Sequence, residues 1–464
     1  MPRVAVLGGG ISGLIAAHRL QELAQESGMA LEIAVYERDA QAGGCLRTVR
    51  ENGLVMELGA DSLLIGKPAA SGLIEHLRLA AEIVEMQPQY RGARLLHGNR
   101  LRPIPRDFRL FAPRSLPALL RSGIFSPAGV ARAALEPFVP ARKETSDESL
   151  ASFVARRFGR EVLERLAQPL VGGIYCADPR RLSMQTALPQ FVELEQRYGS
   201  VVRGLTHVSR DPQANRLVSL RGGMAALIHA LMQRLDGVVY TGVAVEHIER
   251  TADGWNVRLA GGRSDRADAI VCALQAPAAA ALLRPVDAGI ARLLEQIRCN
   301  SVATINLVYD GASVRLPPAT GFVVPFTEGR RIVAATFSSQ KYPHRSSPDE
   351  VLVRVFAGGA LQENVLQTSD EGLARLAHTE LCAVLPVRQA PKRSLVTRWS
   401  AVLPEYAPGH QTTMQVLLAR SRAIPGINFA GCAYSGVGIP DCVAGAQAAA
   451  GSVFGYIRAR KELN

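Results

Sequence analysis

The chain is poor in lysine. Five of its 53 basic residues are lysines, so 48 are arginines, and the formal net charge is +12. A positive charge of this size can attract nucleic acid, anionic lipid or an acidic substrate. The arginines are spread along the chain without zinc-finger spacing or an aromatic RNA-binding motif, which argues against nucleic acid. A GC-rich genome explains the arginine bias equally well, so charge alone assigns no partner.

Paired cysteines and long apolar runs are also absent. The seven cysteines stand at positions 45, 176, 272, 299, 382, 432 and 442, and none forms CxxC. This odd count and wide spacing exclude a disulfide framework and a cysteine-based zinc site, and no other metal site is expected. No stretch of about 18 apolar residues or more is present to span a membrane. The N-terminus MPRVAVLGGG enters a glycine turn instead of a signal-peptide cleavage site. We therefore expect a reduced, cytoplasmic location.

Length and composition are those of a globular protein with more than one folding unit. A chain of 464 residues is too long for one simple domain, and two or three units are expected. Hydrophobic residues make up 48% and charged residues 20%, so a sizeable core is available.

The first forty residues carry the clearest local pattern. Residues 3–7 (RVAVL) predict a buried strand, and Gly8-Gly9-Gly10-Ile11-Ser12-Gly13 follows at once with G-x-G-x-x-G spacing. Residues 14–23 have helical apolar spacing, and residues 31–36 predict a second strand that ends in Glu37. This order predicts a dinucleotide site, with an ordinary glycine turn in a βαβ unit as the alternative.

Each part of this pattern has a physical task. The first glycine permits a tight turn, the second admits a pyrophosphate to the backbone, and the third lets the helix pack on the strand. The helix N-terminus presents free N–H groups and partial positive charge to the phosphates. Glu37 stands 24 residues after Gly13, where its carboxylate can accept hydrogen bonds from both ribose hydroxyls.

A second glycine pair, Gly43-Gly44, resembles that of large FAD oxidases and desaturases, in which it lies beside the pyrophosphate and ribityl chain. The run 57–62 (ELGADS) extends the resemblance and is expected near the isoalloxazine ring. Residues 238–248 predict a strand, and Val245 matches the family position that packs on the adenine. Residues 427–431 (INFAG) and the glycine-rich run 432–442 before a helix over 443–456 predict a third return to the same sheet.

These segments predict the fold class: α/β, with a Rossmann-like FAD-binding domain assembled from three segments, a mixed α+β substrate domain and a helical insert. We expect the FAD-binding domain in residues 1–66, 201–286 and 396–464. The substrate domain is expected in residues 67–93 and 287–395, and the helical insert in residues 94–200. Residues 108–145, rich in proline, leucine and arginine, fit a cap over the active site or an amphipathic pair that meets a membrane surface.

Three further motifs resemble the protoporphyrinogen/coproporphyrinogen oxidase family, within the amine-oxidase-like flavoproteins. They are GGIYCADPRRLS at 172–183, the run from Arg398-Trp399 through Pro404-Glu405-Tyr406 to Gly409-His410, and GCAYSGVGIPDC at 431–442. Together with the glycine-rich pattern of the first forty residues, the resemblance covers essentially the whole chain. Cys176-Ala177 replaces the family's Ala-Gly, and this departure puts the wall of the substrate pocket in doubt. Glu405 replaces a glutamine at a position expected to be peripheral, and neither departure breaks the flavin site.

The resemblance implies FAD- and O₂-dependent six-electron oxidation of protoporphyrinogen IX to protoporphyrin IX in haem biosynthesis. Coproporphyrinogen III oxidation to coproporphyrin III is the alternative within the family. A flavin amine oxidase and a carotenoid desaturase are the alternatives outside it; Cys45 after Gly44, where amine oxidases carry arginine, disfavours the first. Family habit also implies peripheral contact with the inner face of the cell membrane, a homodimer and hand-over to ferrochelatase.

The flavin carries the chemistry, so no catalytic side chain is expected, and Tyr406 and His410 are expected to be structural. The resemblance assigns Arg94 as a carboxylate anchor, Phe356 as an aromatic clamp, Val323 as a pocket wall and Gly173 as a point of close backbone approach. The expected cofactor contacts are Gly8, Gly10, Ile11, Ser12, Gly13, Glu37, Gly43, Gly44, Gly59, Ala60, Asp61, Ser62, Val245, Trp399, Cys432, Val437, Gly438 and Ile439.

Overall fold

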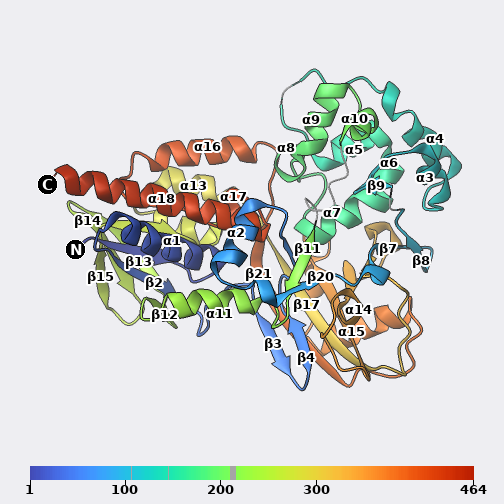
Figure 1. Ribbon diagram of the computed structural model, residues 1–464. Helices are drawn as coiled ribbons and strands as arrows, with labels where there is room; N and C mark the ends of the chain where they lie inside the picture. The colour runs from blue at the N-terminus through green and yellow to red at the C-terminus, as the bar shows by residue number, and fades with distance from the viewer. Residues whose placement is uncertain (106, 145, 209–215, 464) are drawn as a thin grey trace.

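The computed structural model describes residues 1–105, 107–144, 146–208 and 216–463. Three bodies are visible in Figure 1: a parallel sheet covered by helices, a larger mixed sheet, and a group of short helices above that mixed sheet. The first body contains both chain termini, and α7 lies where the helical group meets the mixed sheet.

The first body is built on a five-stranded sheet of order β12-β2-β1-β16-β22 in which every pair is parallel. Its strands are apolar runs because both faces are covered. Val4 and Val6 pack against α1 and α18, and Ala5 and Leu7 pack against the opposite core. The strands are β1 (Arg3–Leu7), β2 (Glu32–Glu37), β12 (Val239–Thr241), β16 (Ala269–Cys272) and β22 (Ile427–Phe429).

Helices and two small sheets complete this body. Its helices are α1 (Ile11–Ser27), α2 (Pro68–His76), α11 (Ala225–Arg234), α12 (Ala276–Leu283), α13 (Ala288–Glu295), α16 (His410–Ser421), α17 (Cys432–Ser435) and α18 (Ile439–Leu463). One small sheet is β13 (Val245–Thr251), β14 (Gly254–Leu259) and β15 (Ser264–Ala267); the other is β5 (Leu63–Leu64), β11 (Leu217–Leu220) and β6 (Ile83–Glu85). The single strand expected over 238–248 is wrong: Gly242, with φ of +71°, ends β12 before β13 begins.

The mixed sheet has seven strands, in the order β21-β17-β20-β19-β18-β7-β8. One face packs on α15 (Asp370–Cys382), and the other faces the hairpin of β3 (Thr48–Glu51) and β4 (Leu54–Glu57). The strands are β21 (Arg393–Pro404), β17 (Cys299–Asp310), β20 (Glu350–Gly358), β19 (Ala334–Phe337), β18 (Gly321–Val323), β7 (Ala93–His97) and β8 (Arg100–Pro103), and α14 (Ser338–Lys341) follows β19.

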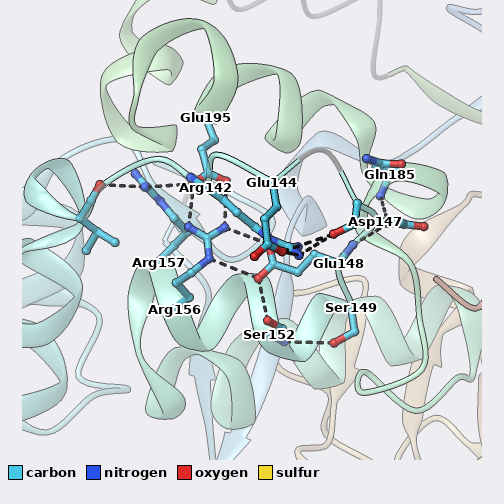
Figure 2. A network of polar contacts seen from close by, with 12 residues as sticks. Arg142, Glu144, Asp147, Glu148, Ser149, Ser152, Arg156, Arg157, Gln185 and Glu195 are labelled. Atoms are coloured by element: carbon cyan, nitrogen blue, oxygen red, sulfur yellow. Dashed lines mark hydrogen bonds and ion pairs between the residues drawn. The ribbon is translucent and has the colours of Figure 1, made fainter. Parts of the chain in front are cut away.

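The helical group has its own aromatic core, in which the rings of Phe111 and Phe191 stack 4.8 Å apart. Its elements are β9 (Phe108–Arg109), β10 (Ala112–Pro113), α3 (Leu116–Arg121), α4 (Pro127–Ala134), α5 (Leu150–Phe158), α6 (Arg160–Val162), α7 (Gln168–Tyr175), α8 (Met184–Ala187), α9 (Pro189–Tyr198) and α10 (Val201–His207). Arginines and carboxylates cross-link it, and Figure 2 shows Arg156 directed toward both Glu148 and Glu195.

The predicted α/β class is confirmed, and the segments at three predicted domain boundaries pair or pack with a neighbouring body. Residue 94 lies inside β7 and residue 396 inside β21, and both strands pair within the mixed sheet. Residue 201 begins α10, whose Val201 and Leu205 pack in the core of the helical group. These pairings join segments far apart in the chain, so local sequence patterns do not reveal them.

Candidate flavin and substrate site

The first glycine turn has no room for side chains at three of its four glycines, and Gly10 alone of the four faces open space. A Cβ on Gly13 would lie 1.9 Å from the carbonyl oxygen of Gly8, and one on Gly9 would lie 2.8 Å from Glu37 Cβ. Helix α1 begins with Gly10 as its N-cap, without a side-chain cap and without an acidic residue in the first turn. The first-turn N–H groups at Ile11 and Ser12 are therefore suited to an external anion.

Glu37 and the second glycine pair complete this end of the site. Glu37 Oε2 accepts a hydrogen bond from Gly9 N at 2.7 Å, which fixes the carboxylate beside the turn. Gly43 N donates to Gly9 O at 2.8 Å, and a Cβ on Gly44 would lie 3.3 Å from Gly10 Cα. The two glycine turns, 33 residues apart in the chain, therefore pack directly on one another.

Two other predicted cofactor segments reach the same edge of the parallel sheet. Val243 N donates to Glu37 O at 2.8 Å, which brings the start of β13, and so Val245, beside the acid. Gly438 precedes the N-terminus of α18, and Ile439 belongs to the core shared with α1. Val437 packs instead against the core of the helical group. The C-terminal motif thus lies where two bodies meet.

The 58–62 segment is clamped between the glycine turns and the mixed sheet. A Cβ on Gly59 would lie 1.9 Å from the carbonyl oxygen of Cys45. The carbonyl oxygen of Leu58 accepts hydrogen bonds from Trp399 Nε1 at 2.8 Å and Thr304 Oγ1 at 2.5 Å. Trp399 therefore positions this segment through its backbone, a role that the sequence did not reveal.

Asp61 is neutralised by two cations that the sequence analysis missed. Lys341 Nζ lies 2.9 Å from Asp61 Oδ1, and Arg354 Nη2 lies 2.9 Å from Oδ2. Burial raises the pKa of the Asp61 carboxyl, but Lys341 and Arg354 outweigh it and hold that pKa well below its ordinary value. Arg354 also donates to Gly59 O at 2.8 Å, and its guanidinium lies 4.8 Å from the centre of the Phe356 ring. The sequence signal that could have identified Arg354 is its place as the one charged residue in the apolar run VLVRVF.

Three of the four predicted substrate residues lie together. Val323 and Phe356 both pair with Ala334, so they share a face of the mixed sheet. A Cβ on Gly173 in α7 would lie 3.9 Å from Val323 Cγ1, so α7 covers this face. The face also carries Arg354 and continues to the 58–62 segment.

Arg94 is not part of this group. It pairs with Phe322, and strand alternation places it on the α15 side of the sheet with Leu96. Its Nη1 donates to Leu101 O at 3.1 Å. The arginine on the Val323 face is Arg102, which pairs with Leu95, the partner of Val323. The carboxylate anchor predicted at Arg94 therefore points away from the predicted pocket.

Arg102 extends from β8 toward the helical group. A Cβ on Gly123, between α3 and α4, would lie 2.6 Å from Arg102 Nη1. Arg102 Nε is buried and has no hydrogen-bond partner among the residues that the structure describes. An arginine offers five N–H donors, and an unpaired buried donor is costly. Arg102 is thus a cation available to a carboxylate at the junction of sheet and helices.

The three family motifs converge on Tyr406. Its hydroxyl donates to Cys432 O at 2.5 Å, its carbonyl accepts from Ser183 N at 2.7 Å, and its ring lies 6.0 Å from that of Tyr175. Burial lowers the pKa of the adjacent His410 imidazole, although a hydrogen bond with the Ala433 backbone and the charge of Asp147 oppose that shift. Tyr406 and His410 join the helical group to the cofactor body.

The departure at Glu405 also has a partner. Glu405 is buried, and its Oε1 accepts from Arg181 Nε at 2.6 Å. The other departure, Cys176, lies at the C-terminus of α7, and its carbonyl accepts from Ala360 N at 2.8 Å. Burial raises the pKa of the Cys176 thiol to about 12, so this group stays protonated at neutral pH.

Comparison with known proteins assigns the class. The sequence model described as flavin containing amine oxidoreductase matches residues 11–453. The chain belongs to this family of flavoenzymes, and the predicted fold, enzyme class and flavin cofactor are confirmed.

Within the family, the predicted resemblance to porphyrinogen oxidases is confirmed. The chain is 30% identical to the coproporphyrinogen III oxidase of Bacillus subtilis, over 98% of each chain. It is also 30% identical to the protoporphyrinogen oxidase of Macaca fascicularis, over 97% of this chain and 98% of that one. A crystal structure from Exiguobacterium, provisionally named a protoporphyrinogen oxidase, superimposes with a TM-score of 0.88 at 29% identity, covering 98% of each chain. Among the described helices, none is long and apolar enough to cross a bilayer.

Proposed function

We propose that this chain oxidises a porphyrinogen to the corresponding porphyrin, with FAD as the electron acceptor. The observation that carries the proposal is the covered sheet face of Val323 and Phe356, which lies beneath Gly173 and leads to the 58–62 segment. An apolar face with an arginine at its far end matches a macrocycle with carboxylate arms.

The residues that would hold FAD fit the cofactor. The Gly8–Gly13 turn and the N-terminus of α1 would receive the pyrophosphate, since Cβ atoms would fill this cradle and no side chain caps the helix. Glu37 would accept the ribose hydroxyls. The Gly43-Gly44 pair, residues 59–62 and residues 437–439 would line the rest, with Val245, Trp399 and Cys432 beside them. Bound flavin would supply a hydride acceptor.

The protein's own part is placement and exclusion of water. Phe356 and Val323 would hold the flat macrocycle, and Gly173 would let it approach the backbone of α7. Arg354 is held against Phe356 and tied to Asp61, so it sets a fixed positive charge at this edge of the face. Burial makes the His410 imidazole a weaker base, and burial keeps the Cys176 thiol protonated, so neither adds a charge to the site.

We propose Arg102, in place of Arg94, as the anchor for a carboxylate arm. It lies on the same face as Val323, whereas Arg94 lies on the opposite face. Like that of Arg94, the buried Nε of Arg102 has no protein partner among the described residues. A carboxylate would complete the hydrogen bonding of this guanidinium.

Of the two porphyrinogens, we place coproporphyrinogen III first and protoporphyrinogen IX second. The Bacillus subtilis relative that aligns over 98% of each chain carries the first name, which supports this order. O₂ is proposed as the electron acceptor that restores the flavin.

We also propose peripheral contact with the inner face of the cell membrane through the helical group. Leu120, Leu135 and Phe138 are 61%, 54% and 75% exposed there, and Arg121 lies beside Leu120. Exposed apolar side chains near arginine suit an anionic lipid surface.

The test is aerobic turnover of the flavin-loaded protein with each porphyrinogen, following porphyrin fluorescence and peroxide together. Two electrons per O₂ over a six-electron oxidation predict about three peroxides for each ring. The ratio of kcat/KM values ranks the substrates. No porphyrin from either compound, with flavin reduction by amines or polyenes instead, would overturn the proposal.

A further inference from the structure

Two histidines and a glutamate meet on the outer side of the parallel-sheet body, away from the site described above. His18 and Glu22 stand one turn apart on α1, and His76 ends α2. Glu22 Oε1 lies 3.0 Å from His76 Nε2 and 3.8 Å from His18 Nδ1. One donor atom from each of the three side chains lies within 4.8 Å of the other two.

The donor set matches a zinc-type ion. Zinc binds imidazole nitrogens and carboxylate oxygens at about 2.0–2.2 Å with tetrahedral angles, so its ligands lie about 3.4 Å from one another. The two separations at Glu22 Oε1 bracket this value. Small side-chain rotations would therefore bring all three donors to bonding distance.

The surroundings orient the ligands. His18 is buried on α1, and its Nδ1 lies 3.8 Å from Glu22 Oε1. Arg19 Nη1 donates to the second carboxylate oxygen, Glu22 Oε2, at 3.0 Å and so leaves Oε1 facing the two rings. A partner of this kind orients a metal ligand.

The charges near the site and its access to solvent determine the affinity that we expect for a cation. Arg19 and Arg234 face His18 and oppose a cation, and the carboxylate of Glu22 favours it. A cavity lined by His18, Glu22 and His76 also includes Gln447 of α18. The amide oxygen of Gln447 or a water molecule would supply the fourth ligand.

We propose that His18, Glu22 and His76 bind one zinc-type divalent ion that clips α2 to α1. Helix α1 carries the first glycine turn at its N-terminus, so the clip stabilises the helix that receives the pyrophosphate. No pattern in the sequence pointed to this site, because His76 is 54 residues from Glu22 and only the fold brings it there.

The experiment is calorimetric titration of the flavin-loaded protein with Zn²⁺ alone, repeated on His76→Ala. His76 is about half exposed, so this variant is expected to fold. The matched control is His378→Ala, since His378 lies 3.6 Å from Cys382 Sγ in α15 and forms an imidazole–thiol pair outside the proposed site. The flavin content of each purified variant is measured as well, because a misfolded protein would not retain the flavin.

We expect one Zn²⁺ per chain in the wild type, at least tenfold weaker binding in His76→Ala and unchanged binding in His378→Ala. Zn²⁺ should also raise the unfolding temperature of the wild type but not of His76→Ala. Wild-type protein that binds no Zn²⁺, or His76→Ala that binds it as well as the wild type, would overturn the proposal and leave ordinary His–Glu pairing. The experiment does not measure porphyrinogen turnover, so a failure of the zinc proposal can be distinguished from a failure of the proposed function.

Discussion

The hydroxyl of Tyr406 donates a hydrogen bond to the carbonyl oxygen of Cys432 at 2.5 Å. This bond joins two motifs that lie 26 residues apart in the chain, and Ser183 of the third motif donates to the carbonyl of Tyr406. The segments that resemble porphyrinogen oxidases most closely therefore form a junction between bodies. Their role is to hold the helical group over the site.

Tyr406→Phe tests this junction. Removing the hydroxyl leaves the Cys432 carbonyl with only the long backbone bond from Gly436 N at 3.4 Å, and we expect a loss of about 1–3 kcal/mol in the free energy of unfolding with weaker flavin retention. Denaturant unfolding and flavin content after dialysis measure these effects. Tyr240→Phe is the control, because Tyr240 is 37% exposed and stacks on Tyr36 without a hydrogen bond from its hydroxyl among the described residues. Equal unfolding curves for both variants would contradict the account.

Arg157 forms the buried centre of the helical group. Its guanidinium and the carboxylate of Glu136 are both fully buried, and Glu136 also accepts from Val201 N at 2.9 Å at the start of α10. Arg157→Met leaves this carboxylate without its cation, and we expect a loss of about 3–5 kcal/mol. Arg160→Met removes an exposed pair with Glu164 and should cause no measurable change. Urea titration of both variants checks this, and a small effect at Arg157 would argue against the buried pair.

Asp61 makes stability depend on acid. Its pKa in the folded protein lies below the value of about 3.9 expected for an unfolded chain, so the folded state binds fewer protons. The ion pairs therefore contribute fully above about pH 5, and this contribution declines as the pH falls through about 4 toward the folded-state pKa. We expect the wild-type unfolding temperature to drop more steeply below about pH 4 than that of Asp61→Asn. Parallel curves from pH 7 to 3 would show that the pairing with Lys341 and Arg354 is absent.

Glycine at position 13 is required by space. A Cβ there would lie 1.9 Å from Gly8 O, whereas a Cβ on Gly451, also helical, would meet nothing within 4 Å. Gly13→Ala should lose flavin on purification, and Gly451→Ala should retain it and gain up to about 1 kcal/mol of stability. The ratio of flavin absorbance to protein absorbance distinguishes them. Full flavin content in Gly13→Ala would show that the turn tolerates a side chain.

The anchor is tested by two arginines on opposite faces of the mixed sheet. Arg102→Met should raise KM for coproporphyrinogen III by about 10–100-fold, the range that corresponds to a charge-assisted hydrogen bond of about 1.5–3 kcal/mol. Arg94→Met should change KM by less than about twofold, since Arg94 faces α15. Steady-state kinetics with matched flavin content separate the two, and the reverse order would restore Arg94 as the anchor.

The sequence was sufficient for the parts of the fold that are encoded locally. Strand β1, the glycine turn, helix α1 and Glu37 follow one another within 35 residues, and the structure has them in that order. The position of Arg94 could not be derived in this way. Which face an arginine occupies depends on the pairing of β7 with β18, more than 200 residues later, and a shift of one residue would reverse it.

The same limit applies to charge. Asp61 was expected at the cofactor, but its partners Lys341 and Arg354 are about 280 and 293 residues away and meet it only through packing of the mixed sheet. The departure at Glu405 shows the same limit. Its carboxylate pairs with Arg181 in the folded protein, and the two separate sequence motifs did not reveal that these residues meet.

The most direct test of the central claim is anaerobic reduction of the bound flavin by coproporphyrinogen III, followed as bleaching of the flavin absorbance in a single turnover. We expect rapid two-electron bleaching of the flavin and slower bleaching in Arg102→Met at limiting substrate. When O₂ is admitted, the flavin spectrum should recover and porphyrin fluorescence should appear, because the six-electron oxidation needs three flavin reductions. A flavin that stays oxidised with both coproporphyrinogen III and protoporphyrinogen IX would contradict it.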